Sequence, residues 1–150
     1  MTAKPIPDGY HTVTPYLIVE GADGLISFMK EAFGAESRGD AFRTPDGKIT
    51  HAELEIGDSV VMLADAGVSP DARVMTAMLH LYVEDCDATF KKAVAAGATP
   101  EREPADQFYG DRSGGVRDAF GNVWYISTHV EDVPPEEMAR RAMQAAAQSS

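Results

Sequence analysis

The side chains best suited to chemistry alternate with apolar residues along extended stretches of the sequence. His51, Glu53 and Glu55 occupy every second position of one stretch, and His80 and Tyr82 have the same spacing further along. Side chains two positions apart lie on one face of a β-strand. We expect these residues either to line a pocket or to form the solvated face of ordinary antiparallel strands.

One chemistry open to these residues is metal binding. Two imidazoles and a carboxylate are the smallest donor set for an open catalytic transition-metal site. His51, His80 and Glu53 supply that set if their strands converge. The two histidines would then be ligands, Glu53 a ligand or base, and Tyr125 a hydrogen-bond donor. The candidate catalytic residues are therefore His51, Glu53 and His80.

A second chemistry is recognition of a positively charged or aromatic molecule. Aromatic rings attract cations over their faces, and carboxylates neutralise them. The candidate ligand-binding residues combine both kinds of side chain: Tyr16, Glu55, Tyr82, Trp124 and Tyr125. Such a site needs no metal.

Periodicity and turn residues predict the elements that position these side chains. Strands are expected at residues 13–20, 36–43, 49–56, 59–64, 76–84, 99–103, 117–120 and 123–129. Helices are expected at residues 24–33 and 86–96, each followed by a glycine, with Asp85 as the N-cap of the second. Residues 104–115 have the composition of a loop that borders a binding site, or of a simple hairpin extension.

The order of these elements repeats, which indicates an internal duplication. Val19-Glu20 recurs 64 residues later as Val83-Glu84, and residues 57–62 recur at the same offset as residues 121–126. We therefore predict an α+β fold of two tandem βαβββ modules, at about residues 10–65 and 75–130. A helical tail at about residues 134–148 is expected to pack on the body or on a second subunit. Residues 1–150 would form one domain.

Composition bounds the class of protein. The 24 acidic and 13 basic residues give a formal net charge of −11. This charge repels nucleic-acid phosphates and favours a cationic small molecule, unless it serves solubility alone. One cysteine cannot form an intramolecular disulfide, and no apolar run approaches the roughly 20 residues of a membrane span. We expect a cytoplasmic protein without nucleic-acid or membrane partners.

Two stretches of the second half resemble the vicinal oxygen chelate superfamily, which includes glyoxalase I, bleomycin-resistance proteins and extradiol dioxygenases. One is residues 81–88 running into the helix end at residues 93–98, and the other is residues 110–112 with 117–124. Residues 118–124, Asp-Ala-Phe-Gly-Asn-Val-Trp, are similar to the Asp-Pro-Phe-Gly-x-x-Trp pattern of glyoxalase-like proteins, with Ala119 in place of proline. The resemblance implies a glyoxalase-like pair of half-barrels around a cavity, in a homodimer.

The resemblance also implies where metal ligands would stand. Metal-dependent members place His and Glu ligands on the first and last strands of each module, and those positions correspond to Thr14, Val61, Met78 and Tyr125. None of the four is a histidine or a carboxylate, which are the donors that a divalent transition metal needs. We therefore expect no cofactor. The alternative is a divalent metal held away from these positions, by His51 and His80 with Glu53.

Three functions follow as hypotheses. The first is a glyoxalase/bleomycin-resistance-like protein that binds a small molecule in the cavity between the modules without the usual metal. The acidic composition of the protein favours a cationic molecule. The second is a metal-dependent lyase, isomerase or dioxygenase-type enzyme with a rearranged His/Glu site. The third is a structural or regulatory dimer module, because one fold hosts many functions.

Overall fold

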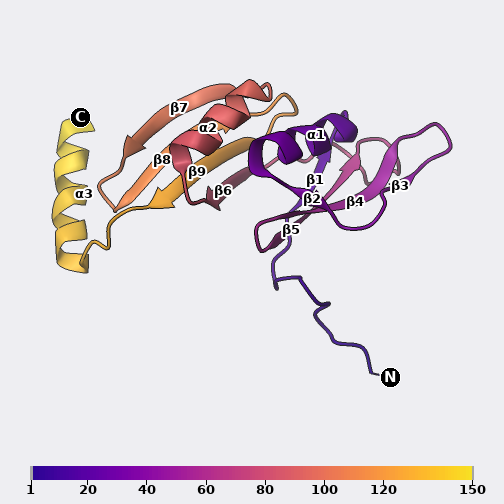
Figure 1. Ribbon diagram of the computed structural model, residues 1–150, viewed down its shortest axis with the longest axis horizontal. Coiled ribbons are helices and arrows are strands. Elements are labelled where there is room, and N and C mark those ends of the chain that lie inside the picture. Colours follow the sequence, from indigo (N-terminus) through magenta and orange to yellow (C-terminus); the bar gives the residue numbers. More distant parts are fainter. Residues whose placement is uncertain (1, 150) are drawn as a thin grey trace.

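The computed structural model describes residues 2–149, which form two β-sheets set end to end, each with a helix on the same side (Figure 1). Residues 1 and 150, which the predicted single domain includes, lie outside the described residues. We call each sheet with its helix a module. An N-terminal arm, residues 2–14, precedes the first module, and a C-terminal helix follows the second.

The first module is a sheet in the order β1-β5-β4-β2, with β3 also paired to β4. Its helix is α1 (Ala22–Phe33). Its strands are β1 (Tyr16–Val19), β2 (Glu36–Ser37), β3 (Phe42–Arg43), β4 (Ile49–Ile56) and β5 (Ser59–Asp65). The first and last strands, β1 and β5, pair in parallel, whereas β4 and β5 are antiparallel.

The second module repeats this plan in the order β6-β9-β8-β7, with helix α2 (Cys86–Ala95). Its strands are β6 (Met78–Tyr82), β7 (Thr99–Asp106), β8 (Asp111–Arg117) and β9 (Val123–His129). Again the first and last strands are parallel and the others antiparallel. The predicted fold class, an α+β pair of βαβββ modules with a C-terminal helix, is confirmed.

Helices α1 and α2 pack against each other and against one face of each sheet. Most of the buried apolar side chains form one cluster that runs through both modules. At the junction, the ring of Phe33 at the end of α1 lies 4.8 Å, centroid to centroid, from Trp124 of β9. Each large apolar side chain buried in this way contributes about 1.5–3 kcal/mol. The shared core therefore fixes one module against the other.

Two predictions about the antiparallel strands are wrong. Residues 36–43 form two short strands because Gly39 between them has φ of 66°, a left-handed conformation that interrupts a strand. Of the two alternatives left open for residues 104–115, a loop and a hairpin extension, the structure shows the hairpin, formed by β7 and β8. Residues 118–120, predicted as strand, form a turn in which the Asp118 carboxylate accepts from the backbone N–H groups of Phe120 and Asn122.

Helix caps agree with the sequence. The Asp85 side chain accepts a hydrogen bond from the backbone N–H of Ala88, as expected of an N-cap. Gly34 ends α1 with φ of 68°, and its N–H bonds back to the carbonyl of Lys30. Both helices are therefore placed by local signals as well as by burial.

Helix α3 (Pro135–Ser149) stands at the far end of the second module and contains no buried residue (Figure 1). Arg141 ties it to the body by donating to the carbonyl of Phe108 and pairing with Glu131. Met138 and Ala142 are half-buried on the same side. Among residues 2–149, no helix combines the length and apolar character that crossing a membrane requires.

Candidate functional site

The face of the first sheet opposite helix α1 carries polar residues predicted from the sequence, and we call it the first open face. Met62 of β5 pairs with Tyr16 of β1 on one side and with Glu53 of β4 on the other. Directly paired residues share a face of a sheet, so these three side chains form a row across three strands. His51 lies on β4 two positions before Glu53, and therefore on the same face.

A chain of hydrogen bonds joins three of these side chains. The Tyr16 hydroxyl lies 3.0 Å from Nδ1 of His51, and Nε2 of His51 lies 2.7 Å from Oε2 of Glu53. A carboxylate only accepts hydrogen bonds, so Nε2 carries the proton. Nδ1 of a neutral His51 is then the acceptor for Tyr16, and Glu53 fixes this tautomer.

Glu53 is held from its other side by the N-terminal arm. The Tyr10 hydroxyl donates to Oε1 of Glu53, and the Arg38 guanidinium lies over the Tyr10 ring, 4.8 Å from its centroid. Arg38 also pairs with Glu55. Burial raises the pKa of Glu53, but hydrogen bonds from His51 and Tyr10 and the charge of Arg38 outweigh it and leave this pKa lowered. Glu53 is therefore a charged acceptor at neutral pH.

The second sheet has a corresponding second open face. The His80 ring is stacked on Tyr125 at a centroid distance of 6.3 Å, and its Nε2 lies 2.8 Å from the Ser127 hydroxyl. Ser127 donates in turn to Ser113. Both serines are fully buried, so neither presents a nucleophile to a ligand. His80 comes next to Ser127 through the pairing of β6 with β9, a contact between strands that lie far apart in the sequence.

A network that the sequence analysis missed surrounds Asp111, whose exposed fraction is 3%. Asp111 accepts a 2.8 Å hydrogen bond from the Tyr82 hydroxyl and lies 2.8 Å from Nδ1 of His129, whose Nε2 is 2.7 Å from Asp132. The bond to Asp111 is the main cause that raises the pKa of Tyr82 and of His129. Tyr82, Asp111 and His129 stand at the ends of three different strands, and no periodic pattern in the sequence links such positions.

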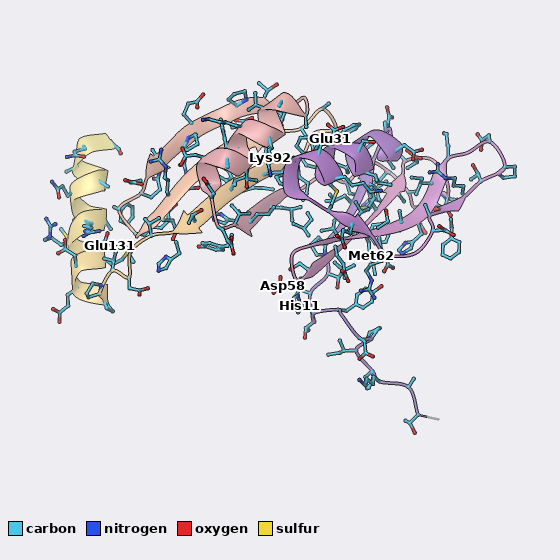
Figure 2. The ribbon with its side chains drawn as sticks, in the orientation of Figure 1. His11, Glu31, Asp58, Met62, Lys92 and Glu131 are labelled. Carbon is cyan, nitrogen blue, oxygen red and sulfur yellow. The ribbon has the colours of Figure 1, made fainter. Side chains whose placement is uncertain are left out.

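A cleft of about 880 Å³ lies between the two modules. Apolar side chains of both modules line it: Phe33, Ile56, Val60, Leu79, Leu81 and Val83. Charged and ionisable side chains also line it: His11, Asp58, His80, Tyr82, Glu84, Asp85 and Lys92. Figure 2 shows Lys92 on α2 at one side of the junction between the modules, with Asp58 and His11 at the other.

The predicted ligand-binding residues are distributed over different surfaces. Tyr82 and Tyr125 lie on the second open face, and Tyr82 also lines the cleft, whereas Tyr16 and Glu55 lie on the first open face. Trp124 borders the cleft but has no exposed surface, and its indole N–H donates to Asp118 at 2.8 Å. The expectation that Trp124 stacks on a ligand is wrong, because its ring is enclosed by the core.

The 64-residue repeat slips by one residue at the last strand. Val61 pairs with Leu54, so its side chain faces helix α1, and only 4% of it is exposed to solvent. Tyr125, by contrast, lies on the second open face. Met62, which pairs with Tyr16 on the first open face, is therefore the structural counterpart of Tyr125. A one-residue shift along a strand reverses the face of every side chain, so the offset that holds on the first strand fails here.

The positions that the resemblance assigns to metal ligands do not fit a divalent transition metal. Thr14 and Met78 offer a hydroxyl and a thioether, Val61 is aliphatic and faces the core, and Tyr125 offers a phenol. Taking Met62, the structural counterpart of Tyr125 in the first module, in place of Val61 adds no imidazole or carboxylate.

The displaced set of histidines is not brought together either. His51 lies on the first open face beside Glu53, and His80 lies on the second open face beside Ser127. Within residues 2–149, no three His, Cys, Asp or Glu side chains are grouped so as to hold a metal ion. The structure therefore joins two of the three predicted catalytic residues and leaves His80 apart.

Comparison with known families finds a match over residues 10–126 to the family described as Glyoxalase/Bleomycin resistance protein/Dioxygenase superfamily. Uncharacterized proteins of Mycobacterium bovis and Mycobacterium tuberculosis are each 37% identical over 135 residues, which cover 84% of this chain. The matches cover 88% of the M. bovis protein and 79% of the M. tuberculosis protein.

Solved structures have the same architecture. TioX from Micromonospora sp. ML1 is 27% identical with a TM-score of 0.65, over 80% of this chain and 99% of that chain. A gene product of Arabidopsis thaliana is 26% identical with a TM-score of 0.64, over 78% of this chain and 98% of that chain.

Proposed function

Because the chain belongs to the glyoxalase/bleomycin resistance protein/dioxygenase superfamily, we propose that it binds a small organic molecule in the cleft between its modules. The cleft itself is the observation that carries this proposal. Its volume of about 880 Å³ lies within the range of roughly 300–1,000 Å³ that is usual for ligand pockets. Because the family's metal positions hold no suitable donors, the binding is proposed to need no metal.

The lining of the cleft supports a ligand with an apolar body. Leu79, Leu81 and Val83 project from β6 and the residue after it, and each is only partly buried. Phe33 and Ile56 face them from the first module. Covering these side chains removes apolar surface from water, which contributes about 25 cal/mol for each Å².

The charges of the cleft support a cationic ligand. Asp58, Glu84 and Asp85 supply three carboxylates against the single ammonium of Lys92. The whole chain carries a formal charge of −11, so its long-range field has the same sign as the cleft. Tyr82 is well exposed at the cleft and keeps its proton, since the bond to Asp111 raises its pKa, and its ring offers a face for stacking.

Fluorescence titration with proflavine, a flat cationic dye, tests this proposal. Saturable binding at one site per chain is expected, and the anionic dye 1-anilinonaphthalene-8-sulfonate should bind more weakly. Ala88→Arg places a long cation in the cleft from the exposed surface of α2. It should weaken proflavine binding about tenfold, which corresponds to about 1.4 kcal/mol.

Ala95→Arg is the matched control, because Ala95 is also exposed on α2 but does not line the cleft. Equal proflavine affinity of the two variants would overturn the assignment to the cleft.

Addition of EDTA should leave proflavine binding unchanged, and loss of binding with EDTA would refute the proposal that binding needs no metal. A calorimetric titration with bleomycin tests the narrower idea of drug sequestration, whose failure leaves binding of other cations standing.

We also propose that two chains associate. Large apolar side chains remain exposed on the open faces, including Phe42 at 68%, Met78 at 68% and Tyr82 at 66%. A second chain would cover part of this surface, and contiguous exposed apolar surface commonly marks an interaction site. Light scattering over a range of concentrations measures the molar mass, and a monomer mass throughout would contradict this proposal.

A further inference from the structure

We propose that Tyr16, His51 and Glu53 form a metal-independent proton relay that ionises a weakly acidic hydroxyl ligand, such as a single-ring phenol, on the first open face. The site is separate from the cleft, which Tyr16, His51 and Glu53 do not line. It is therefore independent of the ligand proposed there.

The geometry gives the relay a direction. Glu53 accepts from Nε2–H of His51 at 2.7 Å, so Nδ1 is left as the acceptor for the Tyr16 hydroxyl at 3.0 Å. The second oxygen of Glu53 is occupied by the Tyr10 hydroxyl. With both oxygens engaged, the carboxylate holds the imidazole in one orientation, which is the arrangement that orients a general base.

Exposure decides which end of the relay meets a ligand. The side chains of His51 and Glu53 are 29% and 18% exposed, whereas Tyr16 is 43% exposed. The phenol of Tyr16 is therefore the accessible end, and the charged end is shielded by the arm. Burial and the charge of Glu53 raise the pKa of Tyr16, so Tyr16 rests as a phenol and not as a phenolate.

A hollow beside the relay sets the size of the ligand. It has a volume of about 370 Å³ and is lined by Met62 together with arm residues that include Pro5, Ile6 and Tyr10. Met62 is the ladder neighbour of both Tyr16 and Glu53. Figure 2 shows Met62 and His11, which also lines the hollow, on the side of the body where the arm begins. The space is near the lower end of ligand pockets, about 300 Å³, and its lining is mainly apolar, which suits one aromatic ring.

The proton step balances without a cofactor. The O–H bond of the ligand breaks as an O–H bond forms on Tyr16, and the original Tyr16 proton moves to Nδ1 of His51. The products are an anionic ligand that accepts a hydrogen bond from Tyr16 and an imidazolium paired with the Glu53 carboxylate. No electrons are transferred, and the total charge of the site and ligand stays constant.

The test uses 4-nitrophenol, whose phenol and phenolate forms absorb at different wavelengths, at a pH below its solution pKa. Wild-type protein should increase the phenolate absorbance saturably and lower the pKa of the bound probe by about one unit, a tenfold change in the ionisation ratio. Tyr16→Phe and His51→Gln should each return the bound probe to its solution ionisation. Glutamine can still donate to Glu53, which limits structural damage.

Tyr125→Phe and His129→Gln are the matched controls, because they make the same substitutions on the second open face, outside the cleft lining, and should keep the response. Ala88→Arg should also keep it, so failure of the cleft proposal and failure of the relay are distinguishable. Nitrogen NMR of the His51 ring gives a readout without substitution: one protonated nitrogen in the free protein and two when 4-nitrophenol is saturating. An unprotonated Nδ1 in the saturated state, no saturable absorbance change, or a response retained by Tyr16→Phe and His51→Gln would overturn the relay.

Discussion

The substitution Asp118→Asn tests how the turn before β9 is built. Asp118 is 4% exposed, and its two carboxylate oxygens accept four hydrogen bonds. One oxygen accepts from the backbone N–H groups of Phe120 and Asn122, and the other from the side chains of Asn122 and Trp124. Every orientation of an asparagine amide places its NH₂ group against two donors.

The expected loss of stability follows from these contacts. Two buried donors left without an acceptor cost about 1–3 kcal/mol each, so Asp118→Asn should lower the free energy of unfolding by about 2–6 kcal/mol. That is a large part of the roughly 5–15 kcal/mol that stabilises a typical domain. Trp124→Phe in the Asp118→Asn background removes one of the four donors, so the double variant should lose less than the sum of the single losses.

Urea unfolding followed by Trp124 fluorescence measures the single variant, and circular dichroism serves the variants that lack the indole. Asp71→Asn is the control, because it makes the same chemical change at an exposed position. A loss of less than about 1 kcal/mol with an unchanged urea dependence would refute the reasoning, since it would mean that the amide found partners at no cost.

Three further predictions concern other contacts. Gly24→Ala places a Cβ within 2.6 Å of the Phe120 ring, so thermal unfolding should show a loss of about 1–3 kcal/mol that Phe120→Leu partly restores; an unchanged melting temperature would contradict this close approach. The pKa of His129 is raised above about 6.5 by hydrogen bonds to Asp111 and to a second carboxylate, so its contribution to stability is complete below pH 6.5 and is lost as the pH rises through the folded pKa. Melting temperatures measured between pH 6 and pH 9 should therefore fall more in wild type than in His129→Gln, and equal slopes would exclude this linkage. Arg141→Met should speed amide exchange in α3 and change global stability by only about 0–1 kcal/mol, because the contacts it removes are largely solvent-exposed; unchanged exchange would mean that other contacts hold the helix.

Some elements could be predicted because local and periodic signals agree. The limits of β4 are as predicted, since apolar and polar residues alternate through it and glycine-containing turns flank it on both sides. The strand β7 was predicted too short because it is exposed along nearly its whole length, so it carries no alternating pattern. The superfamily suggested by residues 81–124 is confirmed by the family match.

The candidate site was predictable only in part, for a geometric reason. Alternation correctly placed His51 and Glu53 on one face of β4, and the pairing through Met62 then brings Tyr16 to the same face. Alternation cannot report how far two different sheets lie from each other, so the convergence of His51 with His80 could not be judged. The contact of Tyr10 with Glu53 comes from an irregular arm, which has no period to read.

The parallel closing pair of each module has a consequence for the order of folding during synthesis. Tyr16 pairs with Met62, and His80 with Tyr125, so a module can close only when its last strand has been made. The first module can close once residue 65 has left the ribosome, but Phe33 then still lacks its contact with Trp124. Until the second module is translated, the end of α1 that carries Phe33 is open to water and to other nascent chains. That interval is when the chain is most vulnerable to aggregation.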